Sequence, residues 1–309
     1  MYMNRKSMTQ KKLAEVFLSC ETGDRIPTFS ALHDLLQVGT GTIQSAIRDF
    51  QEQGAIELQA VQRAGTLLIS KDIERLWSYL PNRHIVGLLP EPSTLEMRGL
   101  AMGLRAAFDS YGVPLVIVYG YGSEVRFDRV LSEEAGADLV ISSRAAARHR
   151  QRSDGALSIQ LDFGRNSFYQ AESLVLVRRK SDALAGAGVE SVGIDYSSYD
   201  HSEMTRAAFP EARYVEVDYT EIPFELLAGT IDAAVWHRTV RLDLLESGPF
   251  SIEPFRLPSE CPDLEDAENA VVSVKASNGV VRGLLKGLEV RKVVDTQQAV
   301  LRGKLSAVF

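Results

Sequence analysis

The sequence predicts an α/β protein in two parts, a small α+β module at the N-terminus and a larger α/β region after it. Two observations support this division. Residues 1–80 follow the order helix, helix, helix, hairpin, whereas strands and amphipathic helices alternate from residue 82 onward. The 309 residues, 45% of them hydrophobic and 24% charged, are also enough for two or three domains. We therefore expect domains at 1–70 and 82–309, joined by a linker helix at 71–81.

The N-terminal module is expected to hold three helices followed by a hairpin. An apolar stripe marks the first helix at 9–20. The stretch "GDRIPT" interrupts the helical pattern, and Thr28 then caps a short second helix. A third helix ends at Gly54, and strands follow at 56–61 and 66–70.

The region from residue 82 alternates between strand and helix patterns. Buried strands are expected at "HIVGLLP", "VPLVIVYG", "ADLVISS", "SLVLVRR", "SVGIDY", "ARYVEVDY", "DAAVWH" and "AVVSVKA". Helices lie between many of them, as at "STLEMRGLAMGLRAAFDSYG". This alternation predicts parallel sheets covered by helices. The length fits two lobes, with the second lobe at about 170–250 and the chain returning to the first near Pro254.

The charge is distributed unevenly along the chain. Residues 1–81 carry nine lysines and arginines and nine acidic residues, so the net charge of −7 belongs to 82–309. Four basic residues within the first twelve meet no acid. An acidic body with a locally basic tip suits a protein that touches nucleic acid through one small module. A solvated, frayed N-terminus would show the same charge pattern.

Several function classes are disfavoured by the composition. Cys20 and Cys261 fall in different expected domains, so we expect no structural disulfide and a reducing cytosol. No Cys/His cluster has metal-ligand spacing, and no cofactor motif is present. The chain shows neither an apolar signal core nor a run long enough to span a membrane. We therefore expect a cytoplasmic protein with no metal, no cofactor and no membrane partner.

Three stretches of the N-terminal module resemble GntR-type transcription regulators. "GDRIPTFSAL" is similar to the family's loop and second helix, and "LLQVGTGTIQSAIRDFQEQGAI" to its turn and recognition helix. "RAGTLL" resembles the tip of the family's wing. The resemblance covers 13–68 and implies a winged helix-turn-helix that binds double-stranded operator DNA, as a homodimer on palindromic half-sites.

The recognition helix departs from the family's pattern. The family usually has Ser at the helix cap, Arg in the next position and Arg two residues after a Thr, whereas this chain has Gly39, Thr40 and Gln44. A helix in the major groove offers its first-turn side chains to base edges and its N–H groups to phosphate. The candidate DNA-contacting residues are Lys11, Lys12, Thr28, Thr40, Thr42, Gln44, Arg48, Arg63 and Gly65.

Two interpretations of the module follow. In the first, Gln44 reads adenine while Thr40 touches phosphate or a thymine methyl group. In the second, the fold persists, but DNA binding is weak or lost and the module serves dimerisation. The basic tip favours the first interpretation, and the neutral net charge of 1–81 favours the second.

The C-terminal region resembles the type 2 periplasmic-binding-protein fold. "FELLAGTIDAAVW", with a helix, a Gly turn and a short strand, is the most telling stretch. Over its whole length the chain is similar to the YhfZ family of GntR-like regulators. This resemblance implies a two-lobed effector-binding domain, without naming the effector.

Ligands of such folds sit at the carboxyl ends of strands. The residues at those ends are Ser93, Thr94, Tyr119, Tyr121, Ser142, Ser143, Tyr196, Ser197, Ser198, Trp236, His237 and Arg238. Arg238 is the preferred single candidate, because an Arg beyond a cleft-facing strand can hold a carboxylate or phosphate at two points. The hydroxyl-rich strand ends predict a small anionic or polar metabolite.

Each of these residues also has a purely structural explanation. Ser93, Thr94 and Ser198 have the sequence position of helix caps. Arg238 could form a structural ion pair, and His237 a hydrogen bond to a neighbour. No motif of a known reaction is present: local crowding in "GIDYSSYDH" is not a triad, which is normally built from distant segments. We therefore expect a sensor and not an enzyme.

Overall fold

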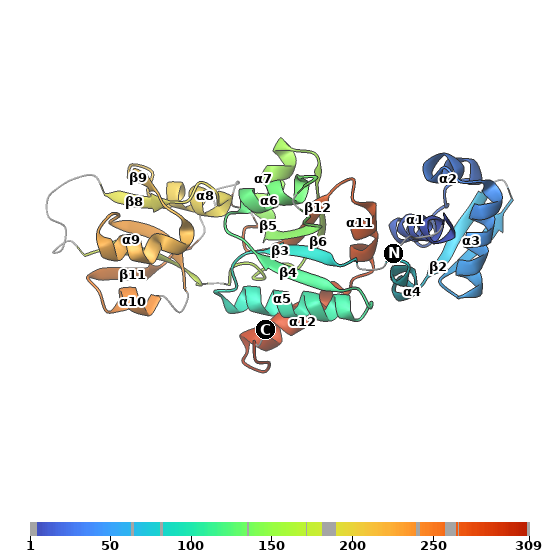
Figure 1. The fold of residues 1–309 in the computed structure, drawn as a ribbon. Coiled ribbons are helices and arrows are strands. Elements are labelled where there is room, and N and C mark those ends of the chain that lie inside the picture. The colour runs from blue at the N-terminus through green and yellow to red at the C-terminus, as the bar shows by residue number, and fades with distance from the viewer. Residues whose placement is uncertain are drawn as a thin grey trace. The chain divides into compact units, whose positions relative to one another are not determined.

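Figure 1 shows the fold in a computed structural model. The structure describes residues 5–62, 65–80, 83–134, 136–170, 172–180, 190–238, 242–256, 264 and 266–307. Arg63 and Cys261 lie outside these ranges. Two compact units are present, and each is described by itself. The first falls within Met1–Ile85, Ala106–Val116 and Ala276–Leu288, and the second within Val86–Arg105, Ile117–Lys275 and Glu289–Phe309.

The N-terminal elements follow the predicted order of helix, helix, helix and hairpin. They are α1 (Arg5–Ser19), α2 (Phe29–Leu36), α3 (Thr40–Glu52), β1 (Ile56–Val61), β2 (Gly65–Lys71) and α4 (Ile73–Ser78). Strands β1 and β2 pair antiparallel, and a bridge between Arg25 and Leu67 adds the loop before α2 to this hairpin. Phe17 of α1 and Phe50 of α3 pack edge to face at 5.7 Å in the core.

Lys71, at the end of β2, holds the end of α1. Its Nζ donates hydrogen bonds to the carbonyl oxygens of Leu18 and Cys20, both at 2.7 Å, and of Phe17 at 3.3 Å. The last carbonyls of a helix have no partner within the helix, so an ammonium there satisfies them and complements the helix dipole. Burial lowers the pKa of Lys71.

The first unit also contains α11 (Gly279–Lys286), which packs against α1. Gly283 lies at the contact, where a Cβ atom would overlap the Leu18 carbonyl group. The glycine therefore allows the two backbones to approach closely. A helix far along the sequence thus completes the packing of the N-terminal helices.

The second part of the chain is built on two five-stranded sheets. The first lobe has the strand order β4-β3-β5-β12-β6, and the second lobe has β11-β7-β10-β8-β9. The strands of the first lobe are β3 (Ile85–Leu89), β4 (Leu115–Tyr119), β5 (Leu139–Ser143), β6 (Leu157–Asp162) and β12 (Ala270–Lys275). Those of the second are β7 (Leu174–Arg179), β8 (Ser191–Ile194), β9 (Arg213–Glu216), β10 (Ala233–His237) and β11 (Phe250–Pro254).

Helices accompany both sheets. Those of the first lobe are α5 (Leu95–Asp109), α6 (Ser123–Leu131), α7 (Arg144–Ser153) and α12 (Val290–Leu301). Those of the second are α8 (Tyr199–Ala208), the 3-10 turn η2 (Tyr219–Glu221), α9 (Ile222–Ala228) and α10 (Asp243–Glu246). Figure 1 shows α5 and α12 on one side of the first sheet, with α6 and α7 on the other.

The expectation of parallel sheets holds for only some of the strand pairs, because both sheets are mixed. Strand β12 runs antiparallel to β5 and β6, and β7 runs antiparallel to β10 and β11. The chain passes between the lobes into β7 and into β12. Leu174 opens β7 opposite His237 at the end of β10, and Ala270 opens β12 opposite Ser143 at the end of β5. A strand that begins beside the carboxyl end of its neighbour must run antiparallel to that neighbour.

One buried apolar cluster is shared by the two lobes. Leu88 and Val140 of the first sheet belong to the same cluster as Val192 and Val235 of the second. A second cluster, which includes Trp236, lies within the second lobe. Because the main cluster is continuous, the lobes are joined by apolar packing as well as by the chain.

Candidate functional site

The exposed face of α3 carries four of the nine predicted DNA-contacting residues. Thr40, Thr42, Gln44 and Arg48 are exposed, while the opposite face of the helix is buried. Gly39 precedes the helix without a side-chain cap, and nothing lies within 4 Å of the place that a Cβ would take at Gly39 or Gly41. The structure thus places four of the predicted side chains on one exposed surface. Packing does not require glycine at position 39 or 41 in the neighbouring first turn.

The other predicted DNA contacts have different surroundings. Lys12 is exposed on α1, and Lys11 is half-buried. Thr28 caps α2, with its Oγ1 accepting the Ala31 N–H at 3.2 Å. Gly65 opens β2 with φ +84, a conformation that favours glycine. Arg63 lies outside the described residues.

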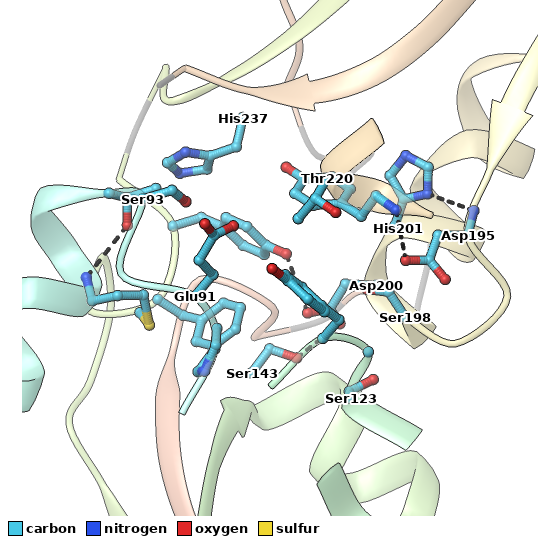
Figure 2. Close-up of a pocket in the computed structure, with 18 of the residues that line it drawn as sticks. Glu91, Ser93, Ser123, Ser143, Asp195, Ser198, Asp200, His201, Thr220 and His237 are labelled. Carbon is cyan, nitrogen blue, oxygen red and sulfur yellow. Dashed lines mark hydrogen bonds between the residues drawn. The ribbon is translucent and has the colours of Figure 1, made fainter. Parts of the chain in front are cut away.

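A pocket of about 390 Å³ lies in the second unit, within the range of small-molecule sites. From the first lobe, the loops after β3 and β4 and the last residue of β5, Ser143, contribute to its wall. From the second lobe, the residues after β8 and β9 and the end of β10 do so. The carboxyl ends of strands from two sheets therefore surround one cavity, which is where α/β folds bind ligands. Figure 2 shows this pocket.

The structure brings seven of the predicted ligand-site residues to the pocket wall: Ser93, Thr94, Tyr121, Ser143, Ser198, Trp236 and His237. The other five do not line it: Tyr119, Ser142, Tyr196, Ser197 and Arg238. Arg238, the preferred candidate, is an exposed residue just beyond β10. Ser197 donates its Oγ hydrogen to Asp195 at 2.6 Å.

Some hydroxyl groups in the wall already have structural partners. Thr94 Oγ1 accepts the N–H of Met97 at 3.3 Å in the first turn of α5. Ser143 Oγ accepts the N–H of Ala146 at 3.0 Å and donates to Asp200 Oδ1 at 2.8 Å. These residues cap helices while they line the pocket, so the structural and the ligand-binding explanations coexist.

Sequence reasoning missed Arg126, which is 5% exposed and lines the pocket from α6. Its Nη1 donates to the Gly120 carbonyl at 2.9 Å, while its Nε is buried without a hydrogen-bond partner. Among the described residues, no carboxylate forms an ion pair with Arg126, and Asp200 and Asp195 act on it only through coulombic attraction. Burial lowers the pKa of Arg126 to about 10, so the guanidinium stays charged at neutral pH. The sequence signal that could have indicated its burial is its position on the same face of α6 as the apolar residues Phe127 and Val130.

Asp200 is the second missed residue and is 3% exposed. Its two carboxylate oxygens accept hydrogen bonds from Ser143 Oγ and, at 3.4 Å, from the Tyr169 hydroxyl. Burial raises the pKa of Asp200 from 3.8 to about 6, against the hydrogen bonds and the charge of Arg126, which lower it. Asp200 is thus a buried carboxylate that is mostly ionised at neutral pH.

Two histidines of the wall differ in their roles. His201 Nδ1 accepts the Asp195 N–H at 3.0 Å, so its Nε2 carries the hydrogen and donates to the Val235 carbonyl at 3.0 Å. Burial lowers the pKa of His201 to about 4, which keeps it neutral. His237 Nε2 lies 3.8 Å from Glu96 Oε1, and its buried Nδ1 has no hydrogen-bond partner. Burial also lowers the pKa of His237.

Short contacts join the lobes beside the pocket. Ser123 Oγ accepts the Tyr199 N–H at 3.1 Å, and the Glu124 N–H donates to the Ser197 carbonyl at 3.0 Å. Gly122 has φ +63, and a Cβ on it would overlap Ser197. The loop before α6 therefore fits directly against the loop before α8.

Two further searches of the structure bear on other kinds of site. Among the described residues, no group of three or more His, Cys, Asp or Glu side chains is arranged to hold a metal ion. No described helix combines the length and the hydropathy that crossing a membrane requires.

Comparison with known proteins places this chain. The model of the YhfZ C-terminal domain matches residues 72–308, and a helix-turn-helix domain model matches residues 21–68. The YhfZ protein of Escherichia coli strain K12 is 26% identical over 308 residues, which is 98% of this chain and 97% of that protein.

Two solved structures are similar in fold. The crystal structure of YhfZ from Shigella flexneri has a TM-score of 0.58 and 26% identity, covering 77% of this chain and 98% of that one. An amino acid ABC transporter substrate-binding protein from Streptococcus pneumoniae, bound to L-arginine, has a TM-score of 0.51 and 15% identity, covering 75% of this chain and 97% of that one. The second likeness shows a shared two-lobed periplasmic-binding-protein-like fold. With its helix-turn-helix domain and its matching C-terminal domain, the chain belongs to the YhfZ family.

Proposed function

We propose that this protein is a cytosolic transcription regulator that binds operator DNA as a homodimer and senses a small polar metabolite. One observation carries the proposal: a single chain holds a helix-turn-helix domain and, in its second unit, a pocket at the carboxyl ends of strands from two sheets. A pocket that binds ligand and a module that binds DNA are the two parts that a ligand-controlled regulator needs.

The surface of α3 supports DNA binding through close approach of the backbone. Bare glycines at 39 and 41 let the first turn approach a phosphate without steric hindrance from side chains. Gln44 can pair with adenine in the major groove, and Arg48 can reach phosphate. Asp49 already pairs with Lys6 at 2.8 Å, which reduces its repulsion of DNA.

The ligand would act on lobes that are already joined. The shared buried cluster and the contacts of Ser123 and Gly122 disfavour wide opening of the two lobes. We therefore expect ligand binding to change local packing beside α6 and α8 instead of swinging whole lobes. The ligand changes the free energy of DNA binding by the same amount as DNA changes the free energy of ligand binding, so the ligand must bind the DNA-bound and the DNA-free protein with different affinities.

A test of DNA binding begins with sequences selected from a random duplex library. Affinity is then measured by fluorescence anisotropy from 50 to 300 mM NaCl. If Lys11, Lys12 and Arg48 each contact one phosphate in both protomers, the slope of log K against log salt is about −5. A slope near −10 would contradict an interface with so few cations.

The variant K11A/K12A/R48A should lose most of this slope and at least about tenfold in affinity. Its matched control is R291A/K292A/K304A, which removes three exposed basic residues near the C-terminal end of the chain and changes the net charge equally. Similar losses in both variants would mean that net charge alone is responsible.

The alternative function is that of a metabolite-binding protein whose helix-turn-helix serves dimerisation. The observation that favours it is the charge of α3, which holds one basic residue, Arg48, and two acidic residues, Asp49 and Glu52. Unchanged DNA affinity in K11A/K12A/R48A, together with a stable dimer, would support this alternative over the regulator.

A further inference from the structure

We propose that the pocket binds a small zwitterion, with a carboxylate on Arg126, a protonated amine on Glu91 and an apolar body between them. This inference names the ligand class of the sensing pocket, and so rests on the proposed function. It begins from two opposite charges in the pocket wall, Arg126 and Glu91, neither of which forms an ion pair with another described residue.

Arg126 is the positive pole. A guanidinium that is 5% exposed, with one carbonyl as hydrogen-bond partner and a buried unpartnered Nε, has lost its hydration without full replacement. A ligand carboxylate is planar and takes two parallel hydrogen bonds from such a group. The buried charge of Arg126 is thus explained if a carboxylate of the ligand is its ion-pair partner.

Glu91 is the negative pole. It follows β3 in the pocket wall, and no hydrogen bond or ion pair joins its carboxylate to any other described residue. Figure 2 shows its side chain reaching into the middle of the pocket. An anion without any positive group would be repelled there, and a simple cation would be repelled by Arg126. A molecule that carries both charges satisfies both residues.

The remaining acids and the apolar wall refine this assignment. Asp195 is already occupied, accepting the N–H groups of Ser197 at 2.8 Å and Tyr219 at 3.0 Å. Asp200 is held by Ser143 and Tyr169. The rest of the wall includes the apolar side chains of Met97, Phe168, Leu174, Met204 and Val235. The ligand's uncharged part is therefore expected to be apolar.

The first arm of the test compares matched small molecules on the full-length protein. The probes are L-leucine, L-methionine and L-phenylalanine, each with its carboxamide and its desamino acid, measured by calorimetry and by thermal unfolding. At least one amino acid should bind, and its carboxamide and desamino acid should bind at least about 30-fold more weakly. Equal binding of the desamino acid would identify a plain anion site, and equal binding of the carboxamide would leave Arg126 without a role. Absence of binding by every probe would also overturn the proposal.

The second arm pairs each charge with its residue. R126M should weaken the amino acid at least about 30-fold but leave the carboxamide unchanged. E91Q should weaken the amino acid but leave the desamino acid unchanged. The controls are R150M, whose Arg150 pairs with Glu124 and Asp128 outside the pocket wall, and E133Q, which alters the exposed partner of Lys275. Both controls should bind the probes like the natural protein.

The unliganded protein gives a third readout. Removing an unpaired buried charge is expected to preserve or raise the midpoint of thermal unfolding, whereas R150M should lower it by breaking two ion pairs. A lower midpoint for R126M than for R150M would assign Arg126 a structural role. Zwitterion binding without any DNA binding would overturn only the proposed function as a transcription regulator. DNA binding that responds to another class of compound would overturn only the proposal of a zwitterionic ligand.

Discussion

Replacing Asp200 by Asn should stabilise the protein at neutral pH and have less effect in mild acid. Asp200 is buried, and its pKa is raised from 3.8 to about 6. The folded state therefore binds the proton more tightly than the unfolded state does. For a group with a raised folded pKa, the stabilising contribution is complete below pH 4 and is lost as pH rises through 6. Asn retains an oxygen for Ser143 and an N–H group for the Tyr169 hydroxyl oxygen.

The magnitude follows from the two pKa values. The loss amounts to about 3 kcal/mol at pH 7.5 and about 1 kcal/mol at pH 4.5, since one pKa unit corresponds to about 1.4 kcal/mol. The difference in free energy of unfolding between D200N and the natural protein should thus grow by about 2 kcal/mol between these pH values. Arg126, Tyr169 and Glu124 also act on this carboxylate, and their effects are already contained in its pKa of about 6.

The assay is urea unfolding at both pH values, monitored by Trp236 fluorescence. Trp236 lies in the second unit and Trp77 in the first, and the chain has two tryptophans. A W77F background therefore leaves one reporter beside the pocket. D128N, which changes an exposed aspartate of α6, is the control and should show no such pH-dependent gain. The reasoning is refuted if D200N and the natural protein keep a constant difference from pH 4.5 to 7.5.

Two other predictions concern the first unit. G283A should destabilise the first unit by about 1–3 kcal/mol, because the new methyl group overlaps the Leu18 carbonyl. The control G41A should stabilise the unit by up to about 1 kcal/mol, because alanine has the higher helix propensity and the position is uncrowded. Trp77 fluorescence during urea unfolding measures both variants, and equal effects would contradict the close packing of α1 on α11. K71M should cost about 1–3 kcal/mol, because three carbonyls at the end of α1 lose their donor. Its readout is hydrogen exchange at the end of α1, where unchanged protection would refute the capping role.

Sequence periodicity predicted the type of most elements because local patterns set them. Thr28 capping α2, Gly39 preceding α3 and Asp72 preceding α4 are short-range features that a linear sequence records. Strand direction is different, since a buried strand has the same pattern whichever way it runs. The elements β6, α7, α10 and β11 escaped prediction, and α7 carries few large apolar side chains on its buried face, where Ala145, Ala146 and Ala147 lie.

The candidate site was predicted in the same uneven way. Residues at strand ends, such as Ser143 and His237, could be nominated because strand ends are visible in the sequence. Arg126 and Asp200 could not, because each lies within a helix and its importance comes from burial. Arg238 follows a strand and could be nominated, yet it is exposed, whereas Arg126 lies within a helix and is buried.

The sequence by itself determined the order of three helices and a hairpin in the N-terminal module and the alternation of strands and helices after it. Those features depend on neighbours within a few residues, so local physical chemistry decides them. Only the tertiary structure decided that β7 and β12 run against their sheets, that one core is shared by both lobes, and which charges face the pocket. These depend on contacts between distant segments, where burial changes the free energy of a charge by more than its residue type reveals.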